Sequence, residues 1–171
     1  MSNPVLPPQA PAPEALLLGE PRFRDAAVDA LARSAGAAAA WRHVLAGDDD
    51  ALATVDGPFA VGIAQADGDG TLAVDRYAIR SLCYRVIDGH LRFAERADDL
   101  AALTPRATLD PQALFDYLYF HVIPSPRTAF HGVNRVPPGH VVRLRAGRLT
   151  VTPYWRPRFQ EPAHPNFDAL A

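Results

Sequence analysis

Apolar and polar positions alternate most regularly between residues 57 and 95, and this stretch predicts four short strands in succession. The first, around residues 59–63, is apolar at every position. We therefore expect both of its faces to be covered, one by helices and the other by a second sheet. Strands at residues 71–75, 82–87 and 90–94 follow, and the dipeptide Asp88-Gly89 predicts a two-residue hairpin between the last two.

Flanking segments predict a strand, several helices and a final hairpin. A short apolar run predicts a buried strand at residues 15–19, and apolar spacing predicts helices at residues 23–33, 37–45, 51–55 and 98–103. In the first helix the expected inner face is formed by Phe23, Ala27, Ala30 and Leu31, and in the second by Trp41, Val44 and Leu45. Residues 48–50 are interpreted as a solvated helix start, and a turn at Pro138-Gly139 precedes a hairpin over residues 141–154.

The helix that starts after Asp110 has the clearest beginning. Asp110 is suited to the N-cap and Pro111 to the first helical position, with a possible staple between Leu109 and Leu114. One face is expected to carry Leu114, Tyr117, Leu118 and His121. Aromatic residues surround this helix, which predicts burial on two sides, partly by another domain; they are Phe115, Tyr117, Tyr119 and Phe120.

A charged connector, residues 75–80, links the second and third predicted strands. Its charges are Asp75, Arg76 and Arg80. We interpret it as a buried, ion-paired turn that fixes strand geometry and contacts a partner domain; a substrate site is the alternative.

Composition narrows the function. All 17 basic residues are Arg, so the chain holds neither a Walker-type phosphate loop nor a Schiff-base lysine. A net charge of -2 argues against nucleic acid or an anionic membrane as a partner, and no apolar run approaches the roughly 18 residues of a membrane span. The single Cys indicates a reducing, cytoplasmic setting, and the six His show no metal-ligand spacing.

An ordered series of motifs carries a family resemblance. It comprises G-P-F-A at 57–60, V-D-R-Y-A-I-R-S-L-C-Y at 74–84, L-R-F-A-E at 91–95, P-S-P-R at 124–127, P-P-G-H at 137–140 and Y-W at 154–155. Together they resemble the N-terminal glutaminase domain of asparagine synthetases, the class II glutamine amidotransferases. The resemblance implies an α+β fold of the Ntn-hydrolase type, an αββα sandwich of two antiparallel sheets, here incomplete at the N-terminus. It also implies a synthetase domain or subunit as partner, using ATP and Mg, a possible homo-oligomer, and no cofactor in this chain.

The resemblance also marks departures at the family's active site. The family's nucleophile is an N-terminal Cys, whereas Ser2 follows Met1 here, and the Pro-rich residues 1–14 have no counterpart of the Arg that holds the glutamine carboxylate. Gly19 and Glu20 match the family's Asn-Gly-Glu segment as vestigial substrate-binding residues, but Leu18 replaces the Asn that donates to the oxyanion. Residues 34–36 lack the expected substrate-binding acid. We therefore expect no catalytic residues.

Isolated candidates have structural interpretations that we prefer. Cys83 is expected to be a buried strand residue, and Ser2 to lie on a flexible lead. His121 is interpreted as a core or interface histidine and His140 as a cap on the sheet.

Two hypotheses remain open. The first is a non-catalytic scaffold or partner-binding domain of an asparagine-synthetase-like protein; the second is a truncated piece of an active glutamine-hydrolysing enzyme. On either, we expect residues 1–14 to form a disordered lead, 15–156 the glutaminase-like domain, and 157–171 a linker toward a synthetase domain.

Overall fold

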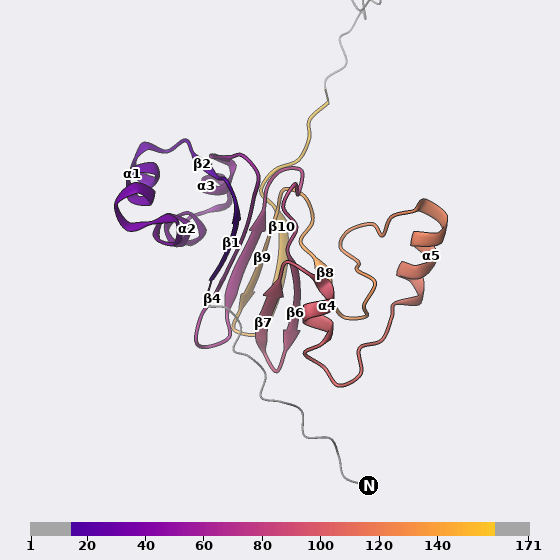
Figure 1. Ribbon diagram of the computed structural model, residues 1–171. Helices are drawn as coiled ribbons and strands as arrows, with labels where there is room; N and C mark the ends of the chain where they lie inside the picture. The colour runs from indigo at the N-terminus through magenta and orange to yellow at the C-terminus, as the bar shows by residue number, and fades with distance from the viewer. Residues whose placement is uncertain (1–14, 160–171) are drawn as a thin grey trace, which may run out of the picture.

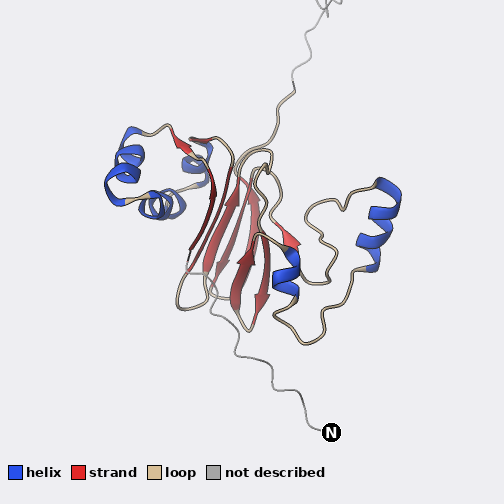
Figure 2. Ribbon diagram, viewed as in Figure 1, coloured by secondary structure: helices blue, strands red, loops and turns tan. Residues whose placement is uncertain are grey.

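Two antiparallel sheets lie face to face in a computed structural model that describes residues 15–159 (Figures 1 and 2). The larger sheet has the order β1 (Ala15–Gly19), β4 (Phe59–Ala64), β5 (Gly70–Val74), β9 (His140–Arg145) and β10 (Arg148–Pro153). The smaller has the order β7 (His90–Ala94), β6 (Cys83–Ile87) and β8 (Asn134–Arg135). A two-stranded ribbon pairs β2 (Arg22–Phe23) with β3 (Val55–Asp56).

Helices form the outer layers. The larger sheet is covered by α1 (Ala26–Ala35), α2 (Ala37–Ala46) and α3 (Asp49–Ala53), and α4 (Ala97–Ala101) packs on the smaller sheet. A fifth helix, α5 (Pro111–Phe120), stands away from the sandwich on the side opposite α1 and α2 (Figure 1). The order helix, sheet, sheet, helix confirms the α+β sandwich that the resemblance implies. No helix among residues 15–159 is long and apolar enough to cross a membrane.

Strand β4 shows why the sandwich has two cores. Phe59 packs toward the helices, with its ring centroid 4.8 Å from that of Trp41, while Ala60 faces a second cluster that contains Phe93 of β7. Gly62 lies under the same Phe93, where an added Cβ would stand 2.7 Å from the ring. The expectation that helices cover one face of this strand and a second sheet the other is confirmed.

The predicted turns are present. Asp88 and Gly89 have φ of 51° and 78°, as a type I′ hairpin turn requires, and Gly139 has φ of 67° after Pro138. Residues 15–19 form a strand as expected, but β1 lies at the sheet's edge and is only half-buried. The expectations for residues 1–14 lie outside the described residues, and the predicted linker is described only as far as residue 159.

Three boundaries or faces differ from the predictions in the helical layer. The first helix begins at Ala26 because Asp25 caps it, accepting hydrogen bonds from the backbone N–H groups of Ala27 and Val28; Phe23 belongs to β2. Its buried residue is Val28, whereas Ala27 and Ala30 are exposed. The third helix ends at Ala53, and residues 48–50 are not simply solvated, because Asp49 pairs with Arg143 of β9 at 2.6 Å.

The start of α5 is as predicted, but most of its apolar side chains are not buried by this domain. Asp110 accepts hydrogen bonds from Gln112 N and Ala113 N, and Pro111 is the first helical residue. The four residues predicted to share one face, Leu114, Tyr117, Leu118 and His121, are all exposed, so their burial by another domain stays a prediction. The helix instead turns Ala113 and Asp116 toward the chain. His121 ends the helix with φ of 58°. Its side chain is exposed, so it is not a core histidine.

Candidate functional site

The turn after β5 is organised by the buried carboxylate of Asp75, which is 3% exposed. It accepts backbone N–H hydrogen bonds from Phe59 at 3.2 Å, Tyr77 at 3.0 Å, and Ile79 and Arg80 at 3.1 Å each. Four N–H donors around one carboxylate stabilise its charge without a basic partner. This hydrogen bonding joins the start of β4 to the turn.

The turn is ion-paired, but Asp75 takes no part in the ion pair. Arg76 instead pairs with Asp56 of β3 at 2.7 Å and donates to the carbonyl oxygen of Ala53, also at 2.7 Å. Arg24 pairs with the same Asp56 carboxylate. The hydrogen bond from Arg76, followed by that from Arg24, lowers the pKa of Asp56 below its usual value. The side chain of Arg80 is exposed.

Gly19 and Glu20 form a tight corner at the end of β1. Gly19 has φ of 88°, and a Cβ there would lie 2.2 Å from the carbonyl oxygen of Pro58. That carbonyl accepts a hydrogen bond from Glu20 N at 2.8 Å, while the Glu20 side chain is exposed. The corner thus has a structural reason for its glycine, and a role in substrate binding stays a prediction.

Leu18 lies one residue before this corner, opposite Ala60 of β4. Its side chain is half-buried and packs on the apolar cluster between the two sheets. A hydrocarbon side chain has no hydrogen to donate, so the position offers no stabilisation to an oxyanion.

The one thiol lies between the smaller sheet and α4. Cys83 is 2% exposed on β6, and burial raises the pKa of its thiol, an effect that the nearby Arg135 partly opposes. The prediction of a buried strand cysteine is confirmed. Nδ1 of His140 lies 2.8 Å from the carbonyl oxygen of Pro138 within its own turn. Among residues 15–159, no three His, Cys, Asp or Glu residues are grouped as metal ligands.

Sequence patterns did not reveal a set of arginines on the outer face of the smaller sheet. Arg85 and Arg92 are direct cross-strand partners on β6 and β7, and Arg135 lies opposite Cys83 on β8. The Nε atoms of these three arginines are the buried side-chain polar atoms without a hydrogen-bond partner in the described part of the chain. The alternation in 83–87 and 90–94 signals strands, and only their pairing register places the like charges side by side.

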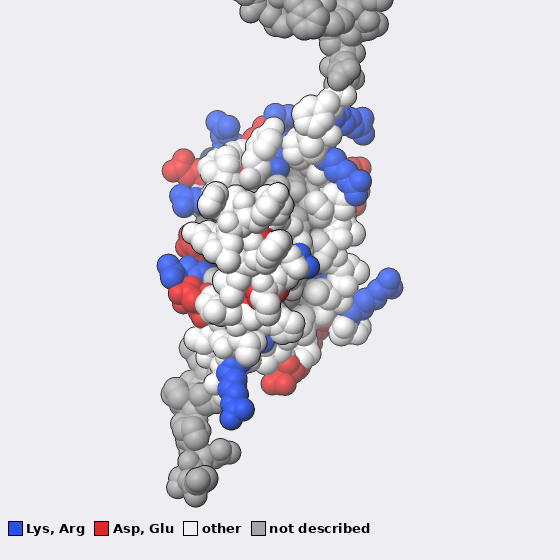
Figure 3. Space-filling model, turned by 90° about the vertical axis from the view of Figure 1, so that its right-hand side faces the viewer, with Lys and Arg blue, Asp and Glu red and all other residues white. Residues whose placement is uncertain are grey.

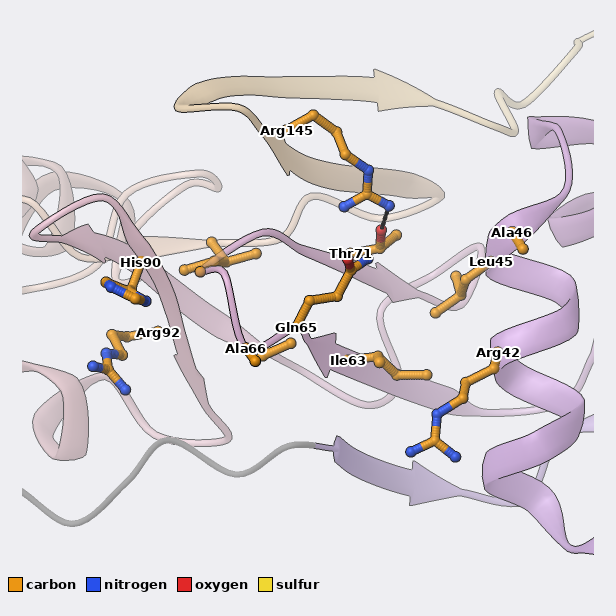
Figure 4. Close-up of a pocket in the computed structure, with 13 residues that line it drawn as sticks. Arg42, Leu45, Ala46, Ile63, Gln65, Ala66, Thr71, His90, Arg92 and Arg145 are labelled. Carbon is orange, nitrogen blue, oxygen red and sulfur yellow. Dashed lines mark hydrogen bonds between the residues drawn. The ribbon is translucent and has the colours of Figure 1, made fainter.

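A cavity of about 770 Å³ lies at the far end of β4 from the Gly19 corner. Arg42 reaches toward it from α2 and Arg145 from β9, while His90 and Arg92 lie on its opposite side (Figure 4). Arg145 is held by hydrogen bonds to Thr71 Oγ1 and to the carbonyl oxygens of Gly70 and Leu144. Since Gly19 pairs with Phe59 and the cavity borders Ile63 and Ala64, the two sites are separated by the length of β4, about 15 Å.

Comparison with known proteins agrees with this architecture. A family described as glutamine amidotransferase domain matches residues 39–155, well over half of the chain. The chain therefore belongs to the glutamine amidotransferase domain family. Its sequence is 29% identical over 89 residues to asparagine synthetase [glutamine-hydrolyzing] 1 of Bacillus subtilis (strain 168). That match covers 52% of this chain but spans only 14% of the length of that relative. The recognition of a class II glutaminase domain related to asparagine synthetases is confirmed.

Proposed function

We propose that this domain no longer hydrolyses glutamine and acts as a scaffold for a synthetase-type domain or subunit. The observation that carries the proposal is Leu18. It packs against the core at the position where the resemblance places an oxyanion-donating amide, and its backbone is fixed by pairing with Ala60. Losing such a donor slows an acyl transfer by about 10²–10³-fold even when every other group is present.

The available nucleophile candidates support the same conclusion. Cys83 is the buried first residue of β6, and its pKa is raised, which is the reverse of what an attacking thiolate needs. Ser34 and Ala35 end α1 and carry no carboxylate to bind a substrate amine.

If the domain is a scaffold, the ATP-dependent chemistry belongs to its partner. ATP and Mg would be bound by the synthetase-type partner, and the setting would be cytoplasmic. Turn residues Tyr77 and Ile79 are largely exposed although Asp75 fixes their backbone rigidly. A rigid turn with exposed apolar side chains suits contact with a partner domain.

The test is glutamate release from glutamine by the purified full chain, followed with a coupled dehydrogenase. We expect a rate equal to that of buffer. The matched controls are Cys83→Ala and Ser2→Ala, which should leave the result unchanged. Turnover by the chain above the rate of buffer would contradict the proposal, and its loss in one of the two variants would identify the nucleophile.

The alternative is that the chain is a piece of an active glutamine-hydrolysing protein. The Gly19–Glu20 corner favours it, because both residues match the family's Asn-Gly-Glu segment and form a tight turn against Pro58. Leu18 argues against it. If a longer product of the same gene hydrolyses glutamine, the alternative replaces the scaffold proposal.

A further inference from the structure

Helix α5 turns its charged residue toward the chain and most of its apolar residues toward solvent. Its one charged residue, Asp116, is 7% exposed and faces the chain, where Gln112 donates to it at 2.7 Å. Arg127 lies 3.8 Å from the same carboxylate and 3.9 Å from Asp110. A helix that served only its own domain would turn charged residues outward and apolar residues inward.

The apolar residues of α5 cover more than half of the helix circumference. Six of them are exposed to a degree of 39% or more: Leu114, Phe115, Tyr117, Leu118, Tyr119 and Phe120. At 100° per residue, the five from Tyr117 through Leu114, Leu118 and Phe115 to Tyr119 span an arc of about 200°. Figure 3 shows that uncharged atoms cover most of the centre of this face, with charged side chains toward its edges.

The exposed area is large enough for a stable interface. An aromatic side chain offers roughly 150–250 Å², so the four aromatic residues of α5, each more than half exposed, present on the order of 400 Å². With Leu118, Leu109 and Val122 added, the surface exceeds the roughly 300–600 Å² of the largest patch on a typical monomer. It approaches the ~800 Å² that each partner contributes to a standard interface.

The width of the apolar arc on α5 indicates what shape of partner surface would cover it. A second α5 related by two-fold symmetry would contact one side of the helix and leave the other sides in water. An arc of about 200° needs a groove with two walls, as when a helix lies between helices of a partner. Three cavities in the described part of this chain have charged groups in their linings: Arg42 and Arg145 in the first, Glu95, Arg96 and Asp98 in the second, and Arg156 and Arg158 in the third. They do not suit an apolar helix.

We propose that α5 is the docking helix of this domain and inserts into an apolar, charge-poor groove of the synthetase-type partner. The partner's identity rests on the proposed function; the insertion itself rests on the inverted faces of α5. The domain supplies the helix, and the ion pairs of Arg127 with Asp110 and Asp116 tie the start and inner face of α5 to the loop that precedes β8.

The test places a photo-crosslinking amino acid, p-benzoylphenylalanine, at position 118 of the full chain expressed in its source cells. The control carries the same group at position 86, where Val86 is 41% exposed on β6. We expect one strong adduct at position 118, identified by mass spectrometry as a synthetase-type domain, and an adduct at least fivefold weaker at position 86. An adduct with a second copy of this chain, with a protein of another kind, or no stronger than that at position 86 overturns the proposal.

A second measurement separates docking from folding. The double variant Phe115→Gln and Leu118→Gln alters only exposed side chains, so it should keep the wild-type melting temperature while co-purification with the crosslinked partner falls about tenfold. Undiminished co-purification contradicts the docking role of α5. Glutamine hydrolysis by the chain would overturn the proposed loss of catalysis and leave these two results untouched, so the two failures are distinguishable.

Discussion

At the scale of single residues, Asp75 connects three parts of the chain through its side-chain and backbone oxygens. Its oxygens bind N–H groups of Phe59 and of the turn, and its backbone carbonyl accepts a hydrogen bond from Gly139 N at 3.0 Å. One residue therefore holds together the start of β4, the end of β5 and the approach to β9. A buried acceptor with several donors is sensitive to any loss of charge or oxygen.

We expect Asp75→Asn to lower the free energy of unfolding by about 2–3 kcal/mol, because an amide nitrogen would face N–H donors that the carboxylate now satisfies. Urea denaturation followed by circular dichroism measures the change. Asp50→Asn, at an exposed carboxylate, is the control and should change stability by less than ~0.5 kcal/mol. Equal effects of the two substitutions would contradict the role assigned to Asp75.

The thiol of Cys83 should be inert in the folded protein. Its burial and raised pKa both disfavour the thiolate, so labelling by Ellman's reagent at pH 8 should require denaturant. The measurement is the labelling rate with and without 6 M guanidinium chloride. Rapid labelling of the native chain would show that the thiol is accessible and would reopen Cys83 as a candidate nucleophile.

At the scale of elements, the sequence predicted those helix starts and turns that depend only on neighbouring residues. Asp110, Pro111 and the pair Asp88-Gly89 fix a helix start and a hairpin through their own backbone preferences. The sequence also marked Leu18 as a departure from the family segment. The direction in which α5 points was not predictable, because an apolar helix buried by its own domain and one buried by a partner have the same composition.

Contacts between distant residues explain the remaining errors. The partner of Arg76 is Asp56, 20 residues earlier, although Asp75 is adjacent in sequence. Asp75 was unavailable because backbone N–H groups already surround it, a fact that only the folded turn contains. The arginine pair on β6 and β7 likewise depends on strand register, since a shift of one residue would separate the two side chains.

We expect Arg92→Thr to raise the free energy of unfolding by about 0.5–1 kcal/mol. The substitution removes a like-charge cross-strand pair with Arg85 and a buried Nε that has no hydrogen-bond partner in the described residues. Thermal and urea denaturation measure the gain. Arg148→Thr on the exposed strand β10 is the matched control and should change little. A loss of stability in Arg92→Thr alone would indicate that the guanidinium has a favourable contact.

At the scale of the whole molecule, one ionic cluster joins two layers. Arg76 comes from the turn after β5, whereas Asp56 lies on β3 and Arg24 directly follows β2, just before α1. Because the folded protein lowers the pKa of Asp56, this carboxylate adds stability above its unfolded pKa of about 3.9. That contribution is lost as the pH falls through the lowered, folded-state value.

We therefore expect the difference in melting temperature between wild type and Asp56→Asn to be largest near pH 6–7 and to shrink as the pH falls below about 4, the unfolded-state pKa of an Asp. Differential scanning calorimetry across this range measures it. Asp50→Asn, at an exposed side chain outside this cluster, is the control and should follow the wild-type acid profile. If the difference in melting temperature between wild type and Asp56→Asn is the same at every pH, the cluster of Arg24, Asp56 and Arg76 does not contribute to acid stability.

The two edges of the larger sheet are chemically unequal. The outer strand β10 carries Arg148, Thr150, Thr152 and Pro153, a set that discourages another strand from pairing there. The opposite edge, β1, carries three consecutive leucines and no charge, and no described strand borders its outer side. When the protein refolds from denaturant at high concentration, cross-β fibrils should therefore nucleate along the leucine edge first.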